Sequence, residues 1–223
     1  MKIAVIVFPG SNCDHDAYYV FSNNLNIKVS FVWHRENNLK QYDGIIIPGG
    51  FSYGDYLRTG SIARFSPVME AVMAAAKVGK PVLGICNGFQ ILIESGLLPG
   101  SLIINKNIKF LSQNVVLEVE SSNSIFTHLL KKGDMLEMPI AHKQGNYIAD
   151  DKVIERLNEE DRIIFRYSNT KYGNPNGSID RIAGILNEKR NVLGMMPHPE
   201  RATELILGSR DGLGIFKSMI GSL

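Results

Sequence analysis

The chain is poor in cysteine and nearly balanced in charge, and both features narrow the possible functions. Its 223 residues include two cysteines, Cys13 and Cys86, which are too few for a disulfide scaffold and lack the paired spacing of a metal site. Lys and Arg number 24 against 22 Asp and Glu, and no basic cluster interleaved with aromatic residues occurs. A nucleic-acid-binding surface is therefore not expected.

Long apolar runs and phosphate-binding motifs are also missing. No apolar stretch approaches the length that spans a membrane, so we expect no membrane association. The apolar run at residues 3–8 ends at Pro9-Gly10, which favours a strand and turn over a signal peptide. The motifs G-x-x-x-x-G-K-[ST] and G-x-G-x-x-G after a strand are absent, which argues against an ATP or dinucleotide site. We expect a cytoplasmic protein with a single domain over residues 1–223.

The most informative segment that is present surrounds Cys86. An apolar run at residues 81–85 ends at this cysteine, which lies between Gly84 and Gly88, and a helix-like segment follows. The pattern is that of a nucleophile elbow, with cysteine in place of serine. Glycines flank such a sharp turn because Cβ atoms would collide there. A sulfur at a helix N-terminus is favoured as thiolate, although a buried, inert cysteine remains the alternative.

A second segment supplies candidate partners for this sulfur. Pro197 and Pro199 hold the chain extended around His198, so the side chains of His198 and Glu200 face the same way. The carboxylate can then orient the imidazole and leave its other nitrogen for a nucleophile. A lone histidine is more often a packing residue, but the two prolines and the glutamate favour a catalytic interpretation.

A third segment offers backbone donors. A buried strand ends at Pro48-Gly49-Gly50, where glycines allow a ligand to approach the backbone closely. The N–H groups of Gly50 and Asn87 together can hold an oxyanion. Taken alone, this segment is an ordinary turn after a strand.

The order of apolar segments predicts an α/β fold with a central, mostly parallel sheet flanked by helices. Runs typical of buried parallel strands lie at residues 3–8, 27–33, 44–47 and 81–85, and helix-like segments lie at residues 14–24, 61–78 and 87–95. We expect an additional antiparallel segment from the strand-like runs at residues 114–119, 135–140, 163–167, 182–186 and 192–195. A turn is predicted at residues 171–178 and a closing helix at residues 211–219.

These motifs, in this order, resemble the class I glutamine amidotransferase family over nearly the whole chain. Within it, the chain is similar to one branch, the separate-chain glutaminase subunits that serve an ATP-using synthetase of purine biosynthesis. The segments that carry this narrower resemblance lie at residues 8–14, 51–55, 58–60 and 174–178.

The resemblance implies a flavodoxin-like core and the hydrolysis of glutamine to glutamate and ammonia. It assigns the site as follows: Cys86 is the nucleophile, His198 and Glu200 complete the triad, Gly50 and Asn87 form the oxyanion hole, and Gln90 and Gly49 contact glutamine. It also implies two partner chains, a large ATP-using synthetase subunit and a small third subunit. ATP and magnesium are expected at the synthetase, with no cofactor or metal on this chain.

One segment departs from the family pattern. His142 lies where the family has a histidine near the active site, usually followed by glycine and an acidic residue, but Lys143 and Gln144 follow here. We therefore leave these three residues out of the predicted catalytic set.

Several alternatives stay open. Cys13 is a rival nucleophile, but the negative charges of Asp14 and Asp16 beside it disfavour a thiolate. A metal site made of His198, Glu200 and a cysteine lacks a close ligand pair in the sequence. The chain could instead be a stand-alone cysteine hydrolase of γ-glutamyl amides or peptides, or a non-catalytic regulatory member of the fold.

Overall fold

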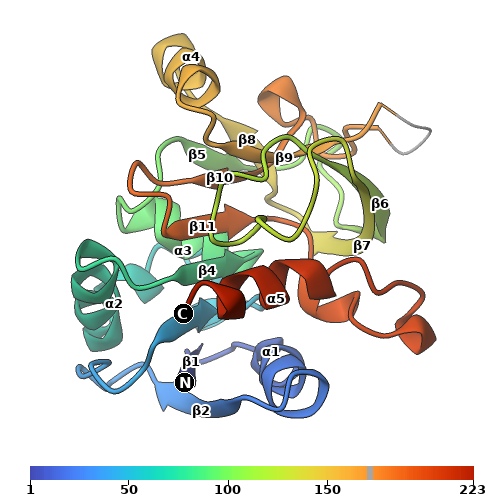
Figure 1. Ribbon diagram of the computed structural model, residues 1–223. Helices are drawn as coiled ribbons and strands as arrows, with labels where there is room; N and C mark the ends of the chain where they lie inside the picture. Colours follow the sequence, from blue (N-terminus) through green and yellow to red (C-terminus); the bar gives the residue numbers. More distant parts are fainter. Residues whose placement is uncertain (170–172) are drawn as a thin grey trace.

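A mixed sheet forms the centre of the computed structural model, which describes residues 1–169 and 173–223 (Figure 1). Its strands, together with those of a smaller sheet, are β1 (Lys2–Val7), β2 (Lys28–Trp33), β3 (Gly44–Ile47), β4 (Val82–Ile85), β5 (Ser101–Ile103), β6 (Leu111–Val119), β7 (Met135–His142), β8 (Asn146–Ile148), β9 (Ile163–Tyr167), β10 (Ile182–Leu186) and β11 (Val192–Met195). The helices are α1 (Asp14–Tyr19), α2 (Pro67–Lys77), α3 (Asn87–Glu94), α4 (Asp151–Glu159) and α5 (Leu213–Gly221).

The described part of the chain forms a nine-stranded sheet in the order β2-β1-β3-β4-β11-β10-β9-β6-β7. The strands from β2 to β11 are parallel, and those from β11 to β7 alternate in direction. Strands β5 and β8 pair separately as a two-stranded antiparallel sheet. The predicted fold class, a mostly parallel core with an antiparallel segment, is confirmed.

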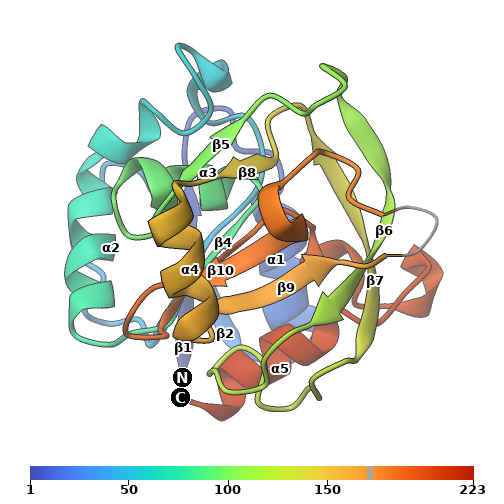
Figure 2. The same ribbon diagram turned by 90° about the horizontal axis from the view of Figure 1, so that it is seen from above.

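Burial explains the difference between the two halves. In the parallel half, β3 and β4 are buried at every residue because helices cover both faces of the sheet. Figure 1 and Figure 2 both place α2 and α3 on one side of these strands and α1 and α5 on the other. Strand β7, at the sheet edge, alternates between exposed and buried residues, as expected for an antiparallel strand with one solvated face.

Several predicted boundaries differ from the structure. The helix predicted at residues 61–78 begins at Pro67, because a residue before proline avoids the helical region and Ser66 is extended. Residues 63–65 form a separate 3-10 turn. The closing helix begins at Leu213 and not at residue 211. Residues 14–24 form α1 followed by a π-helical turn, Val20–Asn24.

The antiparallel pairing predicted for residues 192–195 is correct on one side of the strand and wrong on the other. Strand β11 is antiparallel to β10 but parallel to β4, so it joins the two halves of the sheet. Strands β5 and β8 and helix α4 were not predicted. Of the turn predicted at residues 171–178, residues 171 and 172 lie outside the described residues. Within the described residues, no helix is long and apolar enough to span a membrane.

Candidate active site

Cys86 lies at the turn between β4 and α3 with φ 50° and ψ −105°. Non-glycine residues rarely adopt a positive φ, and such strain costs about 1–3 kcal/mol. The backbone N–H of Cys86 donates to Met195 O at 2.8 Å. A Cβ on Gly88 would lie 1.9 Å from Ile47 O, so this position requires glycine. Close packing of α3 against β3 and β4 therefore produces the predicted elbow.

The neighbouring strand β11 brings His198 to the same edge of the sheet. Met195 of β11 is in register with Ile85 of β4, and the two strands are parallel. The residues that follow β11 therefore lie beside the residues that follow β4. His198 is extended, with φ −101° and ψ 89°, and Pro199 begins a short 3-10 turn that contains Glu200. Both side chains are buried, and His198 Nδ1 lies 2.6 Å from Glu200 Oε1.

Electrostatics favour the protonated form of His198. Burial lowers the pKa of the imidazole, but the Glu200 carboxylate and the sulfur of Cys86 outweigh burial and raise the pKa to about 10. Nε2, the nitrogen not bonded to Glu200, is buried without a hydrogen-bond partner among the described residues. The sulfur of Cys86 is nevertheless close enough to stabilise the protonated imidazole, because it is one of the groups that raise this pKa.

The sulfur of Cys86 faces a pocket of about 240 Å³. It lies 3.7 Å from Ala141 O, at the end of β7, so the antiparallel half of the sheet supplies one wall. The lining residues are Gly50, Phe51, Asp55, Thr59, Cys86, Gln90, Phe110, Ala141, His142, Lys143 and Gln144. A pocket of this size suits a small metabolite.

The two predicted oxyanion donors lie at this pocket from different elements. Asn87 is the first residue of α3, so its N–H has no partner inside the helix. Gly50 lines the pocket with φ +129°, and a Cβ there would lie 2.7 Å from the backbone N of Asn12. Asn87 also accepts a hydrogen bond from the backbone N–H of Ser52 at 3.1 Å, which fixes the loop after Gly50 against α3.

The two predicted glutamine contacts are placed differently. Gln90 lines the pocket, but its amide already bonds within the protein, accepting from Asn87 Nδ2 at 2.9 Å and donating to Gln144 O. Gly49 does not line the pocket. It packs against His198, where a Cβ would lie 2.7 Å from Cε1 of the ring. Proximity alone does not test these assignments, and all the predicted site roles stay predictions.

Cys13 lies close to the histidine–glutamate pair, from the loop after β1. Burial and then Glu200 raise the pKa of its thiol to about 12, while Arg201 lowers it and Asp16 contributes least. Burial is thus the main reason that Cys13 is disfavoured as a nucleophile. The sequence had instead indicated the negative charges of Asp14 and Asp16 as the reason.

Ligand atoms of Cys13, His198 and Glu200 all lie within 4.8 Å of one another. The three ligand atoms are close enough to bind one metal ion, although the sequence had indicated no close ligand pair. However, Arg201 Nη2 lies 3.1 Å from Cys13 Sγ, which puts a positive charge beside the position an ion would take. We therefore keep the prediction that this chain has no resident metal.

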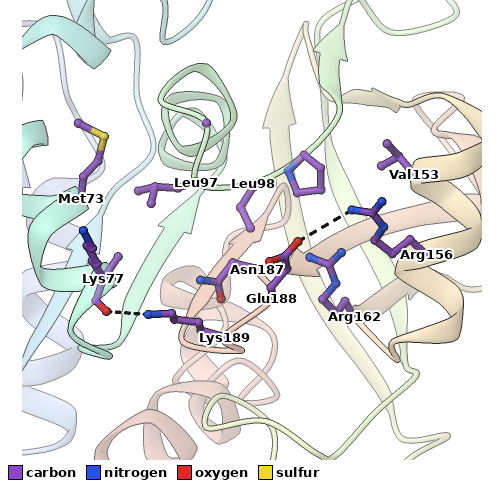
Figure 3. Close-up of a pocket in the computed structure, with 13 residues that line it drawn as sticks. Met73, Lys77, Leu97, Leu98, Val153, Arg156, Arg162, Asn187, Glu188 and Lys189 are labelled. Carbon is purple, nitrogen blue, oxygen red and sulfur yellow. Dashed lines mark hydrogen bonds and ion pairs between the residues drawn. The ribbon is translucent and has the colours of Figure 1, made fainter.

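A larger pocket, of about 570 Å³, lies at the opposite ends of β4 and β11 (Figure 3). Its wall includes Lys77, Asn187 and Lys189, which precede these strands in sequence, whereas Cys86 and His198 follow them. The described residues that line it include no cysteine or histidine. It therefore offers neither a thiol nucleophile nor a histidine base and is not the candidate site.

The sequence missed several residues of the pocket wall. Asp55 and Thr59 lie in segments that carried the family resemblance, but no site role was predicted for them, and Phe110 gave no signal. All three come from loops with no periodic pattern, and the tertiary fold brings them beside Cys86. His142 was considered and set aside, yet it is buried in the wall, with Nδ1 3.2 Å from Asn105 Oδ1. Burial and the nearby His198 lower its pKa to about 3, so it is neutral at ordinary pH.

Comparisons with known proteins agree on one family. A model of the CobB/CobQ-like glutamine amidotransferase domain matches residues 1–210. The curated protein "Phosphoribosylformylglycinamidine synthase subunit PurQ" of Koribacter versatilis is 55% identical over 228 residues, which cover 100% of this chain and 99% of that protein.

Solved structures extend the likeness to the fold. The structure of PurLQS from Thermotoga maritima contains a chain with a TM-score of 0.89 and 44% identity, covering 99% of this chain and 98% of that one. The glutaminase domain of Trypanosoma brucei CTPS with bound acivicin has a TM-score of 0.63 and 15% identity, covering 99% and 94%. At that identity, the second likeness shows the fold alone.

Proposed function

Because the chain belongs to the CobB/CobQ-like glutamine amidotransferase family, we propose that it is the glutaminase subunit of phosphoribosylformylglycinamidine synthase. In this function it hydrolyses glutamine to glutamate, and the ammonia is used to convert formylglycinamide ribonucleotide to formylglycinamidine ribonucleotide in purine biosynthesis. The observation that carries the catalytic part is that Cys86, which lines the small pocket, interacts with His198, and that His198 in turn contacts Glu200.

The first half-reaction forms a thioester. The Cys86 thiolate attacks the side-chain amide carbon of glutamine, and the N–H groups of Gly50 and Asn87 stabilise the oxyanion that develops. One such donor is typically worth about 10²–10³ in rate. The C–N bond then breaks, and protonated His198 gives its proton to the departing nitrogen, which leaves as ammonia.

The second half-reaction releases glutamate. His198, now neutral, takes a proton from water, and the resulting hydroxide attacks the glutamyl thioester. Cys86 leaves as thiolate, which restores the starting state. Glu200 orients the imidazole throughout and stabilises its charged form, as its 2.6 Å contact with Nδ1 allows.

The acceptor chemistry belongs to a partner chain in this proposal. The sequence has no phosphate-binding motif with which to activate an acceptor, and ammonia released into water would be protonated and lost. The similarity to a chain of the PurLQS structure supports assembly with a large synthetase subunit and a small third subunit. ATP and magnesium bind to the synthetase.

Labelling with an electrophilic glutamine analogue tests the function and the nucleophile together. We expect modification of Cys86 that excess glutamine blocks, and no modification of Cys13, because burial raises the pKa of its thiol to about 12. Peptide mapping identifies the labelled residue. Cys86→Ala abolishes glutamate production, whereas the matched variant Cys13→Ser retains it; labelling of Cys13 alone would overturn the assignment. Turnover of γ-glutamyl peptides in preference to glutamine would favour a stand-alone hydrolase instead.

A further inference from the structure

Apart from the sulfur of Cys86, the active-site pocket has one charged side chain of each sign in its wall. Among the described residues that line it, Asp55 is the acidic side chain and Lys143 is the positively charged one. His142 is neutral because burial lowers its pKa. A free amino acid carries one positive and one negative charge on its α-carbon. The wall is therefore complementary in charge to an amino acid.

Asp55 lacks a cationic partner in the described part of the chain. The one hydrogen bond to its carboxylate comes from Asn87 Nδ2 at a long 3.5 Å. Burial raises its pKa to about 6, and no neighbouring charge contributes to that shift. A partly buried carboxylate without a counter-charge is unfavourable, so this part of the pocket is short of one positive charge.

The backbone holds Asp55 in this position under strain. Tyr53, Asp55 and Leu57 all have positive φ, between 54° and 68°. Hydrogen bonds between the Tyr53 hydroxyl and both His34 Nδ1, at 2.9 Å, and Ser66 Oγ, at 2.8 Å, anchor the loop that contains them. Strain of this kind persists where the surroundings impose it, and it clusters at ligand sites.

Asp55 is also within reach of the far end of a bound substrate. Asn87, which contacts its carboxylate, directly follows Cys86 in the chain. In glutamine the α-carbon is three bonds, or roughly 4 Å, from the carbon that the sulfur attacks. A pocket of about 240 Å³ that holds the amide at Cys86 therefore also contains the α-amino group.

We propose that Asp55 binds the α-ammonium group of glutamine and thereby selects the free amino acid over amides that lack this group. Lys143 lies in the same wall to attract the α-carboxylate. This assignment rests on the proposed glutaminase function and adds a specificity-determining residue to it. It also gives a role to Asp55, which lies in one of the segments that carry the family resemblance but had no predicted site role.

The test compares glutamine with 4-carbamoylbutanoate, which is glutamine without its α-amino group. Ammonia release is measured for the chain assembled with its synthetase partner. We expect the wild type to prefer glutamine by about 100-fold in kcat/KM, as for loss of one partner of a desolvated charge pair. Asp55→Asn should lower this preference to threefold or less. Its kcat/KM should fall for glutamine alone, mainly through a higher KM.

Two further variants separate this role from a general effect on the pocket. Lys143→Met should weaken both substrates equally, because both retain the carboxylate. Asp151→Asn, on the exposed first turn of α4, should change neither. Asparagine tolerates a positive φ, so Asp55→Asn keeps the loop backbone, which thermal unfolding verifies.

The outcomes are distinguishable. Equal rates for the two substrates in the wild type, or a preference that survives in Asp55→Asn, would overturn the role of Asp55 and leave the glutaminase function standing. Equal rates in the wild type would decide against Asp55 even if the variant fails to fold. Absence of any Cys86-dependent ammonia release from glutamine would instead overturn the proposed function, and this assignment with it.

Discussion

At the scale of single residues, the Glu200 carboxylate controls the charge of His198. It lies 2.6 Å from Nδ1 and, with the sulfur of Cys86, raises the pKa of the imidazole to about 10 against the opposing effect of burial. A raised pKa keeps the ring protonated at neutral pH. Below about pH 10, the imidazolium is therefore available to stabilise a thiolate and to protonate ammonia.

Glu200→Gln should remove this effect. Burial then dominates and lowers the pKa of His198, so the ring is neutral at pH 7 and the ion pair with sulfur is lost. We expect kcat to fall by about 10² or more, and the high-pH limb of the pH–rate profile to move to lower pH. Glutamate production measured from pH 6 to 10 checks this. Glu204→Gln, on a partly exposed acid nearby, should leave the profile unchanged; an unchanged profile in Glu200→Gln as well would contradict the role.

How much of the site was predictable differs from residue to residue. The prolines around His198 and the glycines around Cys86 constrain the backbone locally, so the sequence alone indicates what these segments do. Asp55 gave no such signal, because its position depends on a strained loop and on a contact with Asn87 from another element. The burial of Cys13 likewise depends on tertiary packing.

At the scale of elements, the close contact between α3 and β3 positions the nucleophile. Gly88 lies in α3, and a Cβ there would meet Ile47 O at 1.9 Å, a backbone atom that cannot move aside easily. Gly88→Ala should therefore push α3 off the sheet and displace Cys86. We expect a loss of about 1–3 kcal/mol in the free energy of unfolding and a lower kcat.

Gly221→Ala is the matched control for this change. Like Gly88, Gly221 is a glycine of a helix, and it is the last residue of α5. A Cβ there would meet no atom closer than 3.4 Å. Urea unfolding of both variants measures the difference. Equal stability of the two alanine variants would show that α3 can move without cost.

Arg166 connects four elements of the antiparallel half. Arg166 lies on β9, and its guanidinium contacts Glu120 Oε1, just after β6, at 3.2 Å. It also contacts Asn158 Oδ1 on α4 at 2.7 Å and the carboxylate of Asp180, just before β10. Its side chain is only 10% exposed. Arg166→Met should cost about 2 kcal/mol or more, because two carboxylates then lose their partner. Arg156→Ala, which removes an exposed pair with Glu188 at 4.0 Å, should cost under about 1 kcal/mol in the same unfolding experiment.

The parallel half of the sheet was easier to predict than the antiparallel half. Continuous apolar runs such as residues 44–47 and 82–85 have one stable environment, between two layers of helices. Strands β5 and β8 are three residues each, too short for a periodic pattern. Helix α4 was missed although Val153, Ile154 and Leu157 follow helical spacing, and that signal was present in the sequence.

At the scale of the whole molecule, the proposed function requires a partner for efficient use of ammonia. We expect weak glutaminase activity from the isolated chain and a marked increase when the synthetase subunit, ATP and acceptor are added. Glutamate production with and without the partner measures this. The complex of Cys86→Ala should lose glutamine-dependent synthesis but retain synthesis from added ammonium salts. High activity that no partner alters would contradict the coupling.

The position of β11 has a consequence for how the molecule acquires its reactivity. This strand lies beside β4 in the sheet, but it leaves the ribosome long after the elbow that contains Cys86. A nascent chain therefore has a nucleophile without its base until β11 pairs with β4. The growing polypeptide is thus unable to hydrolyse glutamine until that pairing forms.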